Sequence, residues 1–425
     1  MTEATDSDTG RREGLFRLAV RKFGPFESAL AKQWETFERQ HRTGLALDAV
    51  PMELHPLHHR LFAQRGLERG TWDAALVCTD WLAEAARSGA LVDIAPYLEG
   101  SPPPGYPDAW SPSVLRFQQF GNRVLGLPFH DGPECLIYRK DLFEDPVEQS
   151  KFARQFTEPL EVPQTWEQFR RVARFFTRPQ VPLYGTAFAA FPDGHNTVYD
   201  FCLQLWSRGG ELFDSSGRMR LDTSEARESL DFYRTLLNDG DAVHPGSHAF
   251  DSVKSGFAFA GGQVAMMVNW FGFAAMSETI SESKVKKRVG VAPVPSGGGS
   301  KISLNVYWIL GIAAGSPHRD LAWKFLSHCA SREMDKLLTL EGGIGCRKST
   351  WCDAQVNTVI PFYHLLEHLH DGARELPRLD NWVQLAAVID RMVLDAIQER
   401  QPTAAITRKA QEGADFLCAK LDPIP

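Results

Sequence analysis

Residues 262–271, GQVAMMVNWF, are the stretch that decides the fold. A glycine and a glutamine precede five apolar residues, and Asn269, Trp270 and Phe271 follow them. A short apolar run with these boundaries is typical of a buried strand, although periodicity alone leaves a buried helix open. We therefore expect a strand that ends at a polar and an aromatic side chain.

The residues after this strand continue in a regular order. KVKKR (284–288) has the character of a basic helical patch, and the prolines of RVGVAPVP (288–295) confine the end of any strand there to a crossing or a sheet edge. SGGGS (296–300) predicts a turn. Residues 304–328 then predict a strand, a Gly-Ser-Pro turn and an amphipathic helix.

Strands and helices also alternate near the start of the chain. We expect strands at 15–20, 45–50 and 71–77, with helices at 26–41 and 57–64 between them. This alternation predicts an α/β protein whose parallel sheet is covered by helices on both faces. Open parallel sheets bind ligands at the carboxyl ends of their strands, so the loops at those ends are the candidate site.

The composition is that of an ordinary globular protein, with 43% hydrophobic and 23% charged residues. The net charge of −7 gives no indication of nucleic acid or of an anionic membrane as a partner. The 11 tryptophans supply flat apolar faces that suit sugar rings. Seven scattered cysteines without a CxxC pair predict free thiols rather than a disulfide framework or a zinc ribbon.

The order of these segments resembles the large ABC-transporter solute-binding proteins, the carbohydrate-binding family 1 that contains the maltose-binding protein. In the second half of the chain, the resemblance rests on GQVAM (262–266) with Trp270, GVAPVP (290–295), GIAAGS (311–316) and AWKFL (322–326). In the first half, it rests on DAAL (73–76), GALVDI (89–94), GLPF (126–129) and LIYRKDLF (136–143).

The resemblance implies a two-lobed periplasmic-binding-protein fold. Each lobe would be a mainly parallel sheet flanked by helices, with a ligand cleft between the lobes and a hinge at three crossings near Pro128, Pro293 and Leu326. We expect a flexible tail at 1–14. Lobe I would then comprise 15–128 with 293–328, and lobe II would comprise 129–292 with 329–425.

The candidate ligand-binding residues come from loops and strand ends that would face such a cleft. They are Phe23, Asp80, Trp81, His130, Asp131, Phe191, Asp193, His195, Asn269, Trp270, Asn305, Tyr307, Trp308, Arg347 and Trp382. By resemblance to the maltose-binding protein, aromatic rings at the places of Phe191, Trp270 and Trp382 would stack on sugar rings. Polar groups near Asp80 and Asn305 would bond hydroxyls. Gly132 stands where the family carries a carboxylate.

We expect a binding protein rather than an enzyme, with no cofactor or bound metal. It would be a monomer that captures a carbohydrate, an oligosaccharide in view of the aromatic supply, and delivers it to the permease subunits of an ABC transporter. The family implies a periplasmic or extracytoplasmic place. Residues 1–14 are polar and acidic without an apolar signal segment, which indicates either a trimmed leader or a cytoplasmic member.

Three alternatives stay open. Asp131 and Glu134 are a possible acid/base pair of a glycoside hydrolase, which needs two facing carboxylates. His364, Glu367 and His368 match HxxEH, which favours a zinc hydrolase if the two histidines share a helix face, and the histidines of HPLHH (55–59) are a possible adventitious metal site. The third alternative is a cytoplasmic sugar sensor on the same fold. GGIGCRKST (342–350) lacks the spacing of a phosphate-binding loop.

Overall fold

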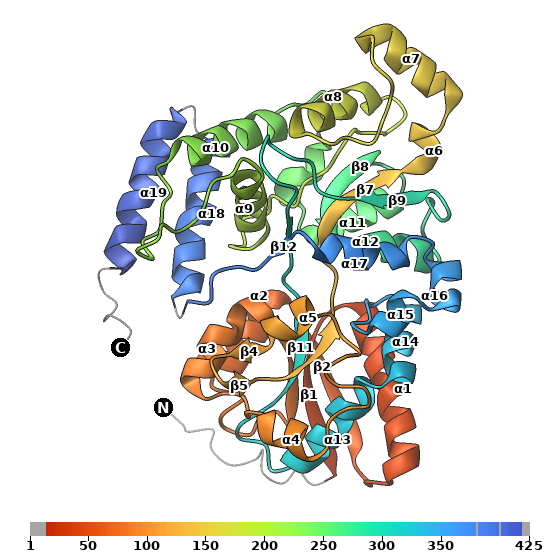
Figure 1. Ribbon diagram of the computed structural model, residues 1–425, viewed down its shortest axis with the longest axis vertical. Helices are drawn as coiled ribbons and strands as arrows, with labels where there is room; N and C mark the ends of the chain where they lie inside the picture. Colours follow the sequence, from red (N-terminus) through yellow and green to blue (C-terminus); the bar gives the residue numbers. More distant parts are fainter. Residues whose placement is uncertain (1–13, 380, 399–400, 419–425) are drawn as a thin grey trace, which may run out of the picture. The chain divides into compact units, whose positions relative to one another are not determined.

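The computed structural model describes residues 14–379, 381–398 and 401–418. The chain forms two compact units (Figure 1). Unit 1 comprises Met1–Asp131 and Val306–Val356, and unit 2 comprises Gly132–Asn305 and Asn357–Pro425. Residues 1–13 of the expected tail lie outside the described residues.

The first division lies close to the crossing expected near Pro128, whereas the other two lie further along the chain than expected. Local hydrogen bonds explain the difference. The Ser296 carbonyl accepts from Trp166 N–H, and Asn305 N–H donates to the Arg374 carbonyl, which holds residues 293–305 in unit 2. In unit 1, Gln33 Nε2 donates to the Met334 carbonyl at 3.1 Å, which ties the residues after 328 to the first helix.

Unit 1 is built on a five-stranded sheet with the order β2-β1-β3-β11-β6. Its strands are β1 (Leu15–Arg21), β2 (Ala46–Met52), β3 (Ala74–Cys78), β6 (Leu127–His130) and β11 (Trp308–Ile312). β1, β2 and β3 pair in parallel, as expected. β11 runs antiparallel to both β3 and β6, so β6 points the same way as β1.

Helices cover both faces of this sheet (Figure 1). The helical spacing of α1 (Gly24–His41) predicts a face formed by Phe26, Leu30, Trp34 (or Gln33), Phe37 and His41. The structure buries these residues except His41, which is exposed at the end of the helix. The expected helix at 57–64 is a short α-helix followed by a π-helix. The other described helices and strands of unit 1 are α2 (Leu54–His58), η1 (His59–Ala63), η2 (Thr79–Trp81), α3 (Leu82–Ser88), α4 (Ala95–Gly100), α5 (Pro112–Phe117), β4 (Gln119–Phe120), β5 (Arg123–Val124), α13 (Arg319–Cys329), α14 (Arg332–Leu340) and α15 (Lys348–Trp351). α16 (Ala354–Val359) spans the third division.

Unit 2 has a three-stranded sheet with the order β8-β7-β9, formed by β7 (Glu134–Arg139), β8 (Met266–Trp270) and β9 (Val289–Ala292). The strand predicted from GQVAMMVNWF is confirmed as β8, and β9 is an edge strand that ends before Pro293. All three strands pair antiparallel, which departs from the mainly parallel sheet expected here. Parallel pairing in the described part of unit 2 occurs between β10 (Ser303–Leu304) and β12 (Ala373–Arg374) and at isolated bridges, such as Tyr184 with Val264. The sequence YGTAF (184–188) predicts a strand, but these residues pair through such bridges and form no strand.

Helices make up most of unit 2. The spacing of Thr165 and Gln168 predicts a capping box, which is present at the start of α8 (Trp166–Phe176). The sequence also predicts Ser224 as the cap of a helix at 224–238, but Thr223 caps α10 (Ser224–Leu237). The other elements of this unit are α6 (Lys140–Phe143), α7 (Pro146–Phe156), α8 (Trp166–Phe176), α9 (Asn196–Ser207), α10 (Ser224–Leu237), η3 (Pro245–Ala249), α11 (Ser252–Ala260), α12 (Phe271–Thr279), β10 (Ser303–Leu304), η4 (Tyr363–Leu365), α17 (Leu366–His370), β12 (Ala373–Arg374), α18 (Trp382–Gln398) and α19 (Thr403–Cys418).

The basic segment 284–288 is a turn, so its prediction as a helical patch is wrong. Lys287 adopts a left-handed backbone conformation with φ of 64°, which an α-helix does not accept. The buried Glu278 carboxylate accepts the Lys287 N–H at 2.7 Å and holds this turn against the end of α12. A tertiary contact therefore overrides the local helix preference of the lysines.

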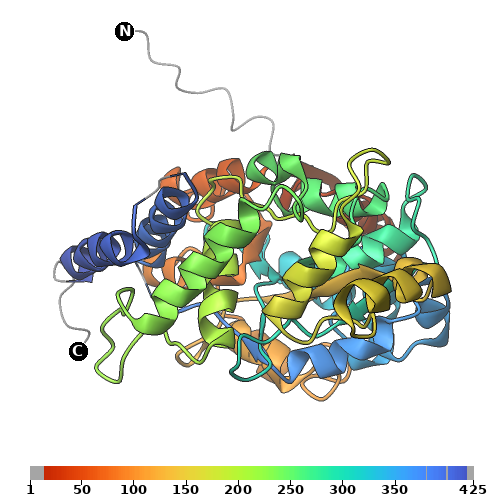
Figure 2. The ribbon, with the colours of Figure 1, turned by 90° about the horizontal axis from the view of Figure 1, so that it is seen from above.

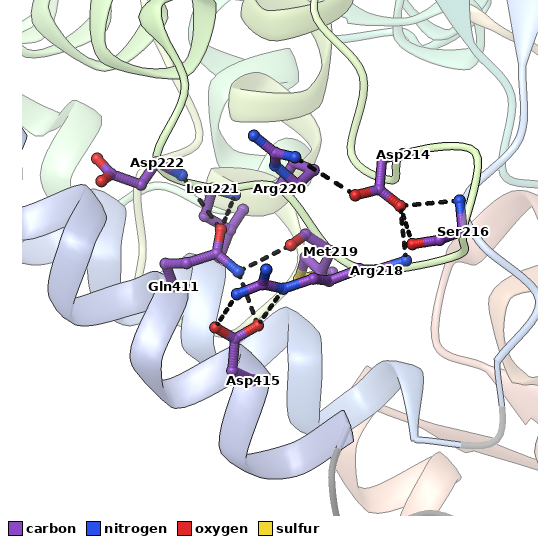
Figure 3. Close-up of polar contacts among 9 residues, drawn as sticks. All are labelled: Asp214, Ser216, Arg218, Met219, Arg220, Leu221, Asp222, Gln411 and Asp415. Carbon is purple, nitrogen blue, oxygen red and sulfur yellow. Dashed lines mark hydrogen bonds and ion pairs between the residues drawn. The ribbon is translucent and has the colours of Figure 1, made fainter. Parts of the chain in front are cut away.

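The last two helices, α18 and α19, lie side by side (Figure 2). A loop at 212–222 is fastened to α19 by side-chain contacts (Figure 3). Gln411 accepts from Leu221 N–H at 2.7 Å and donates to the Met219 carbonyl at 2.8 Å, while Arg218 pairs with Asp415 at 2.6 Å. These contacts give α19 a fixed place on unit 2.

All seven cysteines are free thiols, and five of them are buried, which confirms the expectation of no disulfide framework. Among the described helices, none combines the length and the hydropathy that crossing a bilayer requires.

Candidate functional site

Unit 1 gathers its candidate residues at one edge of the sheet. β1, β3 and β6 reach this edge at their carboxyl ends, and the antiparallel β11 begins there. Trp308 is the register partner of Cys78 on one side and of His130 on the other. Residues that follow β1, β3 and β6 therefore meet the start of β11, which is the edge where α/β sheets bind ligands.

Four of the sequence-predicted residues are connected by ring contacts at this edge. Trp81 packs edge to face on Trp308 with ring centroids 5.6 Å apart, and Phe26 lies 6.5 Å from Trp308. His130 lies 4.7 Å from Phe26 and 6.5 Å from Phe23. Phe23, His130 and Trp308 are half-buried, whereas Trp81 is only 2% exposed. We name Phe23, Trp308 and His130 the aromatic edge, because they keep accessible surface.

His130 is held in one orientation at this edge. Its Nδ1 accepts a hydrogen bond from the Ile344 N–H at 2.9 Å. Burial lowers the pKa of His130 to about 4, against a smaller opposing effect of Asp131, so the ring is neutral at neutral pH. Ile344 comes from the Gly-rich segment 342–347, which sequence reasoning assigned only as a loop.

The other candidates of unit 1 are held inside the unit. The Arg347 guanidinium donates to the carbonyls of Ala330 and Pro104 at 2.7 and 2.8 Å and lies 4.4 Å from the Trp110 ring. The Tyr307 hydroxyl donates to the Val114 carbonyl. Asp131 is 1% exposed and donates its N–H to the Ile344 carbonyl. Asp80 lies half-buried beside Trp81 in η2. These contacts favour a structural role for Arg347 and Tyr307.

In unit 2, Trp270 ends β8 and remains half-buried. Tyr199 packs edge to face on Trp270 at 5.6 Å, and His195 lies 6.0 Å from the same tyrosine. The Asn269 amide donates to Ser255 Oγ at 2.9 Å and to the Ser252 carbonyl at 3.1 Å, which ties β8 to α11. Tyr199 was not among the candidates, although the sequence predicts a loop at 191–196 and a helix at 198–207 that contains this tyrosine.

The remaining candidates of unit 2 lie in loops and at a helix start. Asp193 accepts from the His195 N–H at 2.9 Å and so shapes the loop that leads into α9. Phe191 is 43% exposed, and the Lys254 ammonium lies 5.7 Å from its ring. Trp382 begins α18 and is only 3% exposed, which favours the core over a ligand platform. Asn305 is buried beside the 373–374 strand.

A buried acidic pair lies next to Trp270. Glu134 is the register partner of Trp270, and burial together with the charge of Asp200 raises its pKa well above the usual range. Burial also raises the pKa of Asp200 to about 7, and the Tyr233 hydroxyl donates to this carboxyl at 2.6 Å. These carboxyls are therefore stabilised in a protonated form, and sequence reasoning did not identify Asp200.

The HxxEH histidines do not share one continuous helix. His364 lies in η4, and Glu367 and His368 lie in α17. His364 contacts the Asn357 amide oxygen at 3.1 Å, while His368 lies 3.8 Å from Asp371 on an exposed surface. Because the two imidazoles have these separate partners on a surface, the geometry does not favour a zinc hydrolase.

Comparisons with known proteins agree with this architecture. The chain is similar to the mannitol-binding protein of Pseudomonas aeruginosa, with 26% identity over 326 residues, 75% of this chain and 71% of that protein. Its fold is similar to that of maltose-bound T. maritima MalE3, with a TM-score of 0.82 at 24% identity over 95% of this chain and 99% of the other. It is also similar to an ABC transporter solute-binding protein of Agrobacterium radiobacter K84 in complex with ribitol. The TM-score is 0.84 at 23% identity, over 95% of this chain and 99% of the other.

The match at the level of the family is broad. The family model for bacterial extracellular solute-binding proteins matches residues 63–336, which include β3, β6, β7 and β8 and so extend over both units. The chain therefore belongs to the family of bacterial extracellular solute-binding proteins.

Proposed function

We propose that the protein captures a neutral carbohydrate or sugar alcohol and delivers it unaltered to an ABC transporter. The observation that carries this proposal is the aromatic edge, where accessible rings of Phe23 and Trp308 flank a neutral imidazole. A sugar presents apolar C–H faces and a rim of hydroxyls, so flat rings beside a hydrogen-bonding group complement it. Relatives named for mannitol, maltose and ribitol support this class of ligand.

The two units would act as lobes, each contributing an aromatic end of its sheet. Unit 1 would contribute the aromatic edge, and unit 2 would contribute Trp270 with Tyr199. We further propose that the protein acts as a monomer outside the cytoplasm and docks on permease subunits.

Hydrolysis of the ligand is disfavoured by the state of the acidic groups. Asp131 is 1% exposed and Glu134 is 5% exposed, so neither presents a carboxylate to a ligand at the surface of its unit. A glycosidase needs one ionised and one protonated carboxyl that flank the scissile bond. Binding without chemistry is the function that this arrangement supports.

Calorimetric titration with a panel of sugars and sugar alcohols tests the proposal. We expect saturable binding of at least one member and recovery of the same compound by chromatography. Trp308→Ala should weaken binding by about tenfold or more, since the loss of a stacked ring removes a contact of about 1–3 kcal/mol. Tyr97→Phe, on α4 away from the aromatic edge, is the matched aromatic control. Absence of binding across the panel, or turnover of the ligand, would contradict the proposal.

A further inference from the structure

The Gly-rich segment 342–347 is joined to the end of β6 by two backbone groups of one residue. The Ile344 N–H donates to His130 Nδ1 at 2.9 Å, and the Ile344 carbonyl accepts from Asp131 N–H at 3.0 Å. Ile344 itself is fully buried. Its position is therefore fixed by one hydrogen bond to the imidazole and a second to the backbone of Asp131, the residue after His130.

A buried carboxylate holds the next residues of this segment in place. Asp335 Oδ1 accepts from Cys346 N–H at 2.7 Å, and Oδ2 accepts from Arg347 N–H at 3.2 Å and from the Thr350 hydroxyl at 2.5 Å. Asp335 is 4% exposed, and the Gly345 N–H donates to Thr339 on the same helix. A Cβ on Gly345 would lie 2.4 Å from Asp335 Oδ2, so the close approach of this loop to α14 requires glycine.

We propose that Asp335 and the 342–347 loop fix His130 as the Nε2–H tautomer, so that the ring presents a single hydrogen-bond donor that recognises a neutral oxygen acceptor of the ligand. The reason is that a neutral imidazole carries one proton, and a nitrogen that accepts a hydrogen bond does not carry it. Nδ1 accepts from Ile344, so the proton is on Nε2. The part of this inference that concerns the ligand rests on the proposed function.

The surroundings of the ring preserve this state. α1 contributes Phe26 and Phe23, β11 contributes Trp308, and the loop contributes the backbone of Ile344, none of which is charged. Asp131 is the charged group that acts on the ring, and its effect is smaller than that of burial. Among the described residues, none forms a hydrogen bond with Nε2, and the half-buried ring retains accessible surface for a ligand.

A fixed donor at His130 limits the chemical groups of a ligand that can bind there. A fixed N–H donor favours a hydroxyl, ether or carbonyl oxygen and gives no favourable contact to an ammonium group. Asp335 acts as a positioning residue, because it reaches the ligand only through the loop and His130. A hydroxyl that accepts from Nε2 should be required, and its removal should weaken binding by about tenfold, as expected for one hydrogen bond at a buried site.

Nitrogen NMR of the protein labelled with ¹⁵N tests the tautomer without any ligand. Signals of the 13 histidines are separated by long-range ¹H–¹⁵N correlation, and His130 is assigned from the signal that is lost in His130→Gln or by triple-resonance experiments. We expect an unprotonated Nδ1 and a protonated Nε2 that stay unchanged between about pH 6 and 8. A protonated Nδ1, or a mixture of the two tautomers, would overturn the inference.

A pair of variants tests the role of Asp335. Asp335→Asn replaces one acceptor oxygen by a donor and should release the loop, which gives mixed His130 tautomers and an affinity reduced by about fivefold to tenfold. Glu333→Gln removes an exposed charge from the same helix and should change neither signal nor affinity. If Asp335→Asn leaves the tautomer fixed, Asp335 is not the positioning residue.

Ligand analogues separate this inference from the proposed function. If the wild-type protein binds no carbohydrate, the proposed function fails, while the tautomer measurement still stands. Suppose that the wild type binds a sugar, but that each monodeoxy analogue of this sugar has the same affinity for His130→Asn as for the wild type. The proposed contact to Nε2 is then wrong, while the proposed function is retained. We expect one analogue that binds the wild type more weakly than the parent sugar does, and that binds His130→Asn with the same affinity as the parent sugar.

Discussion

Trp81 and Trp308 pack edge to face with ring centroids 5.6 Å apart and ring planes at 89°. Trp81 is buried by this contact and by Phe62 and His58, whereas Trp308 remains half-buried. The Trp81 indole is therefore part of the core of unit 1, whereas the Trp308 indole has an accessible face at the carboxyl edge of the sheet.

This difference predicts separate effects of two tryptophan substitutions. Trp81→Ala should lower the free energy of unfolding by about 3–5 kcal/mol, because it leaves a cavity under the aromatic edge. Trp308→Ala should cost less stability and more affinity. Urea denaturation and calorimetric titration of both variants measure the two quantities. Equal losses of stability with unchanged affinity in Trp308→Ala would assign Trp308 to the core.

Substitution of Arg347 should act on stability rather than on binding. The guanidinium satisfies two carbonyls and stacks on Trp110, so Arg347→Ala leaves the buried Ala330 carbonyl without this donor, removes the bond to Pro104 and should cost about 2–4 kcal/mol. Arg347→Lys should recover little of this, since an ammonium cannot reproduce the planar contacts. Thermal unfolding and titration with the same sugar distinguish this outcome from a direct ligand contact, in which affinity would fall without loss of stability.

The acidic pair below Trp270 predicts a specific dependence of stability on pH. The pKa of Asp200 is about 7 in the folded protein and near 3.8 in the unfolded chain, so the folded state binds more protons between these values. The contribution of Asp200 to stability is therefore present below about pH 4 and is lost as the pH rises to about 7. Glu134, whose pKa is also raised, adds to the effect in the same direction.

Asp200→Asn removes this proton linkage while keeping an oxygen that accepts from Tyr233. Relative to the wild type, the variant should become more stable as the pH rises from about 5 to 8, by about 2–3 kcal/mol. Urea denaturation at several pH values measures the difference between the two proteins, so contributions of other acids cancel. A difference that does not change with pH would contradict the raised pKa. Asp141→Asn, which removes a carboxyl paired with Arg139 elsewhere in unit 2, is the control.

The contacts in Figure 3 predict unequal roles for two residues of α19. Gln411→Ala removes the partners of Leu221 N–H and the Met219 carbonyl and should cost about 1 kcal/mol. Asp415→Asn weakens an exposed ion pair with Arg218 and should have a smaller effect that disappears at high salt. Hydrogen exchange of residues 403–418 in the two variants measures the local opening of α19. Greater exchange in Asp415→Asn would reverse this ranking.

Local signals in the sequence predicted the elements that depend on local forces. The apolar run at 264–268 became β8, and the buried positions of α1 followed its helical spacing. The capping box at Thr165 formed because its partners are three residues apart and need no tertiary contact. Two predictions failed where other hydrogen bonds form. Residues 284–288 form a turn, not a helix, because Glu278 accepts the Lys287 N–H, and Thr223 caps α10 because its hydroxyl accepts the Ala226 N–H.

The candidate site was predicted less completely. The sequence indicates which loop residues follow a strand, but it does not indicate the direction in which their side chains point. Phe23, His130 and Trp308 were expected at strand ends and lie together at the edge of one sheet. Arg347 was expected from its Gly-rich loop, yet carbonyls of two distant loops bind its guanidinium. Asp335 and Asp200 give no local signal, since the Cys346 N–H and the Tyr233 hydroxyl that bond to them lie 11 and 33 residues further along the chain.

By itself, the sequence determined the alternation of strands and helices and the order of motifs that marks the family, because periodicity, turns and caps are properties of neighbouring residues. The tertiary structure decided that the strands of the β8-β7-β9 sheet pair antiparallel, that one tryptophan of a pair is buried and the other accessible, and that His130 Nδ1 accepts a hydrogen bond from the Ile344 N–H. Strand direction, burial and tautomer depend on which distant groups meet, and that is fixed only when the chain has packed.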